Sequence, residues 1–91
     1  MASIRIPMPL RKLTNEVDVV NTDAQSLSEA VERLESDFPG IKERIVDETG
    51  QIRRFVNIYV NGEDVRFLDN LATALKPGDE VSIVPAVAGG V

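Results

Sequence analysis

Hydrophobic and polar residues alternate in two short stretches near the amino terminus, as they do in half-buried β-strands. The stretch SIRIP places Ile4 and Ile6 on one face of a strand, and EVDVVN does the same with Val17 and Val19. The first stretch ends in a proline, which cannot donate a hydrogen bond to a β-ladder. The short polar connection predicts a hairpin, with these four side chains facing inward.

The hydrophobic period changes to that of an amphipathic helix in the stretch SLSEAVERLESDF. The apolar positions at helical spacing are Leu27, Val31, Leu34 and Phe38. Ser26 and Glu29 form an S-x-x-E capping box, which marks the start of the helix, and a Pro-Gly pair ends it. The following IKERIVD predicts one further turn, with Ile41 and Ile45 buried.

The sequence FVNIYVNGEDV predicts a strand followed by a tight hairpin turn at Asn61-Gly62. A short helical segment and a Pro-Gly turn then lead into a last strand. The inward positions of the two strands are Val56, Ile58, Val60, Val81 and Ile83. The resulting order, β-β-α-β-β, predicts the α+β class and a β-grasp (ubiquitin-like) mixed sheet with one main helix packed on one face. We expect residues 1–85 to form this domain and residues 86–91 to form a flexible tail ending in Gly-Gly-Val.

Composition removes most catalytic chemistry. The chain of 91 residues has neither cysteine nor histidine, so it lacks thiolate ligands, disulfides and the commonest general base. Its adjacent carboxylates are expected to be solvated loop residues, and no stretch has the spacing of a calcium loop. We therefore expect no metal site, no cofactor-binding site and no enzymatic activity of its own.

The charge pattern and the amino terminus bear on partners and location. The net charge is −5, and the basic residues do not cluster, so nucleic acid is not expected as a partner. No stretch has the length of a membrane span, and the amino-terminal residues are not those of a signal peptide. Together with the absence of cysteine, this predicts a cytoplasmic protein.

The carboxyl-terminal stretch AVAGG has no capping or amphipathic pattern. Frayed termini often contain glycine, so structural irrelevance is one interpretation. The functional interpretation is that a carboxylate must enter a narrow site on an enzyme. Glycine suits that task, because it has no Cβ and tolerates nearly any backbone angle.

Two stretches, RFVNIYVNGEDVRF and LATALKPGDEVSIVPAVAGG, resemble the ThiS and MoaD family of ubiquitin-like sulfur carriers. The resemblance covers nearly the whole chain, from SIRIP to Gly90. It implies a protein that is a substrate rather than an enzyme. In the family, an E1-like enzyme uses ATP to adenylate a terminal glycine, and sulfur then displaces AMP to leave a thiocarboxylate. Gly90 matches that glycine, Gly89 matches its neighbour, and residues Ala86, Val87 and Ala88 match the tail that binds the activating enzyme.

The acceptor of the sulfur differs between branches of the family. The resemblance is strongest to the branch that makes cysteine, whose partners are a pyridoxal-phosphate cysteine synthase and a JAMM-type zinc protease. The other branches supply sulfur to a molybdopterin precursor or to the thiamin thiazole. A ubiquitin-like protein modifier and a non-conjugated interaction module are alternatives from other classes, because the same tail or fold serves them.

Val91 departs from the family pattern, which ends on Gly-Gly. It moves the terminal carboxylate by about 3.5 Å and places a β-branched side chain beside it. A precursor trimmed by one residue, an added remnant and a carrier that has lost its role are all possible interpretations. We favour the precursor, because everything before Val91 fits a working carrier.

A partner surface is predicted on the sheet face opposite the helix. The strand alternation places Phe55, Tyr59 and Val84 there, and exposed aromatic residues on one face indicate a docking patch. The alternative is that these side chains cover sheet edges or pack against the 42–52 loop.

Overall fold

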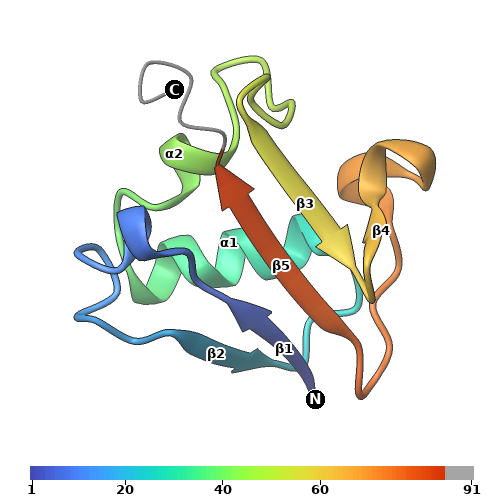
Figure 1. Ribbon diagram of the computed structural model, residues 1–91, viewed down its shortest axis with the longest axis horizontal. Helices are drawn as coiled ribbons and strands as arrows, with labels where there is room; N and C mark the ends of the chain where they lie inside the picture. The colour runs from blue at the N-terminus through green and yellow to red at the C-terminus, as the bar shows by residue number, and fades with distance from the viewer. Residues whose placement is uncertain (86–91) are drawn as a thin grey trace.

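The computed structural model describes residues 1–85, which form a mixed five-stranded sheet with helix α1 across one face (Figure 1). The strand order is β2-β1-β5-β3-β4. The strands are β1 (Ala2–Arg5), β2 (Val19–Thr22), β3 (Val56–Val60), β4 (Glu63–Asp64) and β5 (Glu80–Pro85). The helices are α1 (Leu27–Asp37) and α2 (Lys42–Ile45), with 3-10 turns η1 (Met8–Leu10), η2 (Val65–Phe67) and η3 (Asn70–Ala72). This architecture confirms the predicted α+β, β-grasp fold.

The core lies between α1 and the sheet. The predicted inward positions of β1, β3 and β5 are all buried, as are Leu27, Val31 and Leu34 of α1. Phe38, just after the helix, is partly buried against the core. The predicted turn after α1 buries Ile41 and Ile45 completely. These four-residue and eleven-residue helices therefore contact one continuous apolar core.

The predicted capping box begins α1, with one difference. Ser26 Oγ accepts a hydrogen bond of 3.2 Å from the Glu29 amide, as expected for an N-cap. In a capping box the glutamate accepts a hydrogen bond from the amide of the N-cap residue, which here is Ser26. The Glu29 carboxylate instead accepts a hydrogen bond of 2.7 Å from the amide of Gln25, one residue earlier. The box therefore satisfies a backbone donor just outside the helix.

The prediction that Val17 and Val19 face inward is wrong. Their side chains are 38% and 40% exposed, and strand β2 begins only at Val19. Asn15 and Glu16 have positive φ angles of 55° and 67°, so the chain is still turning there. Val20 lies opposite the buried Ile4 in the antiparallel β1–β2 pair. Because side chains alternate between faces, that register turns Val19 away from the core.

The hairpin turn after β3 is confirmed. Asn61 and Gly62 both have positive φ angles, 52° and 87°, as the predicted turn requires. The Asn61 side chain donates a hydrogen bond of 2.9 Å to Asp79 and accepts one of 2.9 Å from the Glu80 amide. One side chain thus ties the hairpin to the start of β5.

Two further predictions concern the carboxyl-terminal tail and membrane-spanning segments. The predicted tail, residues 86–91, lies outside the described residues, so its separation from the 1–85 domain stays a prediction. Among residues 1–85, no helix is long and apolar enough to cross a membrane.

Candidate functional site

The strand that leads into the predicted tail is the central strand of the sheet. Strand β5 pairs in parallel with β1 and antiparallel with β3, and its last residue, Pro85, lies opposite Val56 (Figure 1). The side chains of Val81 and Ile83, both in β5, are buried in the core. The chain is therefore paired on both sides up to Ser82, and β3 alone continues the pairing to Pro85, the residue before the tail. The predicted functional residues of the tail are Ala86, Val87, Ala88, Gly89 and Gly90; they lie outside the described residues, and their roles stay predictions.

The structure brings the predicted partner surface together on the sheet face opposite α1. Val84 of β5 pairs with Asn57 of β3, and Tyr59 pairs with Ser82, so these side chains share one face. Phe55 directly precedes β3 and is 54% exposed, whereas Val84 is 45% exposed and Tyr59 is half-buried. No segment of residues 1–85 covers Phe55 or Val84, which argues against the packing alternative for these two. The role of the surface stays a prediction.

Arg66 stabilises this surface, a role that was not predicted from the sequence. Its guanidinium donates hydrogen bonds to the Asn57 side chain at 2.8 Å, the Val56 carbonyl at 2.7 Å and the Arg53 carbonyl at 3.1 Å. These bonds fix the backbone on both sides of Phe55. The Asn61-Gly62 turn is the sequence signal that could have indicated this role. A two-residue turn pairs Val60 with Glu63, and continuing that register places residue 66 opposite residue 57.

Basic side chains lie around Phe55 although the chain is acidic overall. The Arg54 guanidinium carbon lies 6.0 Å from the centre of the Phe55 ring, within the range of a cation–π contact. Arg53 donates a hydrogen bond of 2.7 Å to the Glu43 carbonyl. An apolar patch with a basic border would suit a partner with an acidic border around an apolar pocket.

Three carboxylates have perturbed titration, and each of them fixes a turn. The backbone amides of Lys42 and Gly40 lower the pKa of Glu35, which holds the turn between α1 and α2. The Thr49 hydroxyl and then the Gln51 amide lower the pKa of Asp47. The Asn61 side chain and then the Lys76 amide lower the pKa of Asp79. No group of three or more carboxylates within residues 1–85 is placed to hold a metal ion.

Comparison with known proteins connects this fold to a family. A family model described as the ThiS family matches residues 4–90. The chain belongs to the ThiS family. This confirms the predicted family, and the match includes both glycines of the tail.

Three relatives illustrate the range of the family. The sulfur carrier protein CysO of Mycobacterium tuberculosis is 47% identical over 90 residues, which are 97% of each chain. A chain in the crystal structure of the Amycolatopsis orientalis BexX/CysO complex has a TM-score of 0.92 and 41% identity, covering 99% of this chain and 100% of that one. The small archaeal modifier protein 3 of Haloferax volcanii is 38% identical over 68 residues, which are 75% of this chain and 73% of that protein. These relatives are carriers and modifiers, which supports the expectation that the chain is a substrate of enzymes and not an enzyme.

Proposed function

We propose that this protein is a sulfur carrier, and that the carboxylate of Gly90 carries the sulfur as a thiocarboxylate. The similarity to CysO over nearly the full length of both chains carries this proposal. The match also extends to Gly90, the glycine that the family chemistry uses.

The proposed chemistry has two steps. A carboxylate oxygen of Gly90 attacks the α-phosphorus of ATP on an E1-like enzyme, and pyrophosphate leaves. Hydrosulfide or an equivalent sulfur nucleophile then attacks the acyl carbon, AMP leaves, and a proton is lost to give the thiocarboxylate. Adenylation is needed because a free carboxylate is a poor electrophile. ATP is used by the activating enzyme, and the carrier needs no bound cofactor.

The described structure suits a carrier that presents its end to an enzyme. Pairing with β1 holds β5 up to Ser82 and pairing with β3 holds it up to Pro85, so the reactive end is delivered from a rigid base. The open sheet face beside this point carries Phe55, Tyr59 and Val84, which we propose as the surface that docks on the activating enzyme. Docking through a preformed surface would position the tail without ordering the domain itself.

The finer assignment follows the branch of the first relative. We propose that the thiocarboxylate serves cysteine synthesis, with a pyridoxal-phosphate cysteine synthase as the acceptor enzyme and a JAMM-type zinc protease as the releasing enzyme. We also place the carrier in the cytoplasm, a reducing compartment that suits a chain without cysteine. The molybdopterin and thiamin routes are distinguished from this one by supplying the thiocarboxylate form to each acceptor enzyme in turn and measuring which product forms.

ATP–pyrophosphate exchange with the cognate activating enzyme tests the first step. A protein ending at Gly90 should support exchange, and a protein ending at Val91 should not until a JAMM-type protease has removed Val91. The longer form places its carboxylate about 3.5 Å too far along the chain. Equal exchange by both forms would disprove the requirement for trimming, and exchange by neither would disprove the carrier role.

A ubiquitin-like modifier is the second candidate, because the Haloferax relative is a modifier protein. The two functions give different products with a lysate of the source cells, ATP and the activating enzyme. A carrier gains the mass of one sulfur-for-oxygen exchange, whereas a modifier appears in a series of larger covalent adducts.

A further inference from the structure

Strand β2 lies at one end of the sheet and has a partner on one side only, among the strands of residues 1–85. The Ile6 amide bonds to the Asp18 carbonyl at 2.8 Å, and the antiparallel register pairs Ile4 with Val20. Hydrogen-bonded pairs alternate in such a ladder, so Val20 and Thr22 direct their amides and carbonyls toward β1. Val19 and Asn21 therefore direct theirs outward. No loop or side chain within residues 1–85 bonds to these outward groups.

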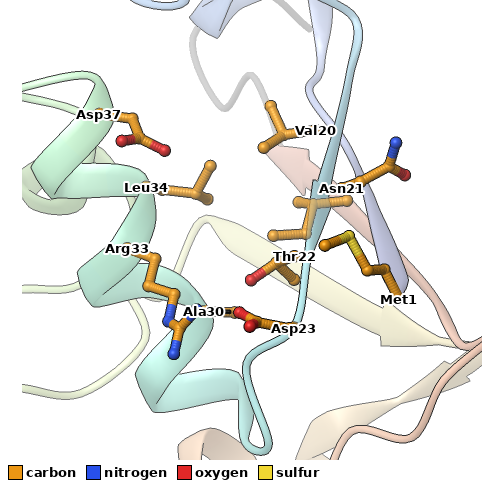
Figure 2. Close-up of a pocket in the computed structure, with 10 residues that line it drawn as sticks. Met1, Val20, Asn21, Thr22, Asp23, Ala30, Arg33, Leu34 and Asp37 are labelled. Atoms are coloured by element: carbon orange, nitrogen blue, oxygen red, sulfur yellow. Dashed lines mark hydrogen bonds and ion pairs between the residues drawn. The ribbon is translucent and has the colours of Figure 1, made fainter.

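A groove of about 150 Å³ lies between this free edge and α1 (Figure 2). Val20, Ala30 and Leu34 line it with apolar surface, and the buried Ile4 also contributes. A cavity of about 150 Å³ with aliphatic walls accommodates a benzene-sized group, so this groove has room for one apolar side chain. Outward backbone groups and a side-chain pocket thus lie next to each other.

Acidic side chains lie at both ends of the groove. At one end Asp23 forms an ion pair with Arg33 from α1, and at the other end Asp37 projects from the last turn of the helix (Figure 2). The Arg33 guanidinium also lies 3.8 Å from the Glu29 carboxylate, so its charge is shared between two acids. No ion pair within residues 1–85 involves Asp37. Of the charged side chains that line the groove, Asp23 and Asp37 are acidic and Arg33 is basic, so their net charge is −1.

An open strand edge can pair with a second copy of this chain or with a segment of another protein, and charge favours the second. A second copy would add its β2 in an antiparallel direction and bring its own Asp18 and Asp23 to the acidic ends of the first. Like charges placed together across strands destabilise a pair. A segment with lysine or arginine at its ends would instead meet complementary charge.

We propose that the β2 edge is a docking site for an extended, basic segment of a partner protein. The segment adds as a sixth strand next to β2, and its backbone bonds to the amides and carbonyls of Val19 and Asn21. Its central apolar side chain enters the groove against Val20 and Leu34, and its flanking basic side chains lie near Asp23 and Asp37. Backbone bonds supply affinity in such complexes, and the side-chain pocket supplies specificity.

This site is separate from the surface proposed for the activating enzyme. Strands β1 and β5 lie between β2 and β3, and Phe55 and Tyr59 belong to the β3 side of the sheet. A partner could therefore hold the carrier at β2 while a second protein works at the end of β5. The site does not depend on the sulfur chemistry, so failure of one proposal leaves the other standing.

Amide hydrogen exchange of the full chain, measured by nuclear magnetic resonance, tests the proposal. The probe is an acetylated, amidated peptide, Lys-Lys-Val-Ile-Val-Lys-Lys, at millimolar concentration. The peptide should slow exchange of the outward Val19 and Asn21 amides several-fold and shift the methyl signals of Val20 and Leu34. Two matched peptides serve as controls. One replaces every lysine with glutamate, and the other carries N-methyl groups on alternate amides, so neither should slow exchange.

Two variants of the chain sharpen the test. Asn21→Pro removes an outward donor without removing a bond to β1, so it should abolish peptide binding and retain the β1–β2 pairing. Asp37→Lys should weaken binding at least threefold, whereas Asp69→Lys, with the same charge change outside the groove, should not. Unchanged exchange at Val19 and Asn21, or equal effects of the basic and acidic peptides, would overturn the proposal. Slowing that depends on the concentration of the protein alone would also overturn it, because the occupant would then be a second copy.

Discussion

Phe55 and Phe67 are both exposed aromatic residues, yet only one of them belongs to the proposed docking surface. Phe55 is 54% exposed beside β3, on the face that also carries Val84, and its backbone neighbours are held by Arg66. Phe67 is 86% exposed on η2. Because buried aromatic side chains dominate the energetics of interfaces, the two residues form a matched pair for testing the surface.

We expect Phe55→Ala to weaken binding to the activating enzyme about tenfold, which corresponds to about 1.4 kcal/mol. Phe67→Ala should change the dissociation constant less than about twofold on the same interface argument. Calorimetric titration measures both constants, and urea unfolding checks that each variant is folded. Equal losses of binding in the two variants, or a loss of stability in Phe55→Ala that matches its loss of binding, would contradict the proposed surface.

Asp79 gives a prediction about pH. Hydrogen bonds from Asn61 and the Lys76 amide lower its pKa below the ordinary value of 3.8. A lowered pKa in the folded state stabilises the fold above the ordinary pKa, and this stabilisation is lost as the pH falls through the folded-state value. Asp79→Asn should therefore be less stable than the natural chain at pH 7, and the difference should shrink below about pH 4. Urea unfolding across this range measures the difference, with Asp69→Asn as the control. A constant difference at every pH would contradict the assignment.

Single residues also mark where prediction from the sequence fails. The alternation in EVDVVN predicted Val17 and Val19 inside, but Val20 and Thr22 face the core instead. Two neighbouring valines made both registers possible from the sequence. Pairing with β1 and the turn at Asn15 and Glu16 selected one of them, and neither constraint is visible in the local pattern.

At the scale of elements, α1 depends on its first residue. Ser26 Oγ accepts from the Glu29 amide, and the loss of such a cap costs about 1 kcal/mol. We expect Ser26→Ala to lower the free energy of unfolding by about that amount. Ser28→Ala, inside the same helix, should leave stability unchanged or slightly raised, because alanine is the better helix former. Urea unfolding of both variants measures the effect, and equal changes would show that the cap does not set the stability of α1.

Elements with strong local signals were predictable. The capping box and helical period gave α1, Asn-Gly gave the β3–β4 turn, and strict alternation gave the buried faces of β3 and β5. Strand β4 and the role of Arg66 were not foreseen. Both depend on how far the hairpin pairing continues, and β4 ends after only two residues because η2 begins at Val65.

At the scale of the whole molecule, the core cluster of the described residues 1–85 extends from Ile4 to Ile83, and we expect the tail to add little to it. Removal of Gly89 and Gly90 should therefore change the melting temperature by less than about 4 °C, which corresponds to less than about 1 kcal/mol. The same deletion should abolish thiocarboxylate formation. Differential scanning calorimetry checks the first expectation, and a large loss of stability would show that the tail belongs to the folded core.

The family and the site of chemistry were predictable for different reasons. The family follows from strand and tail sequences that extend over nearly the whole chain, and the family match confirms it. The predicted tail residues rest on chemistry rather than on geometry, because a carrier's reactive group is a backbone carboxylate. The open β2 edge was not predictable, since it depends on the sheet order and on the corrected register of β2.

Intact mass spectrometry tests the central claim most directly. Protein ending at Gly90 is incubated with the cognate activating enzyme, ATP and sulfide, and its mass is compared with that of an untreated sample. The carrier proposal predicts an increase equal to the difference between one sulfur and one oxygen atom, located by fragmentation on Gly90 and absent when ATP is omitted. An unchanged mass, or sulfur located on any other residue, would contradict it.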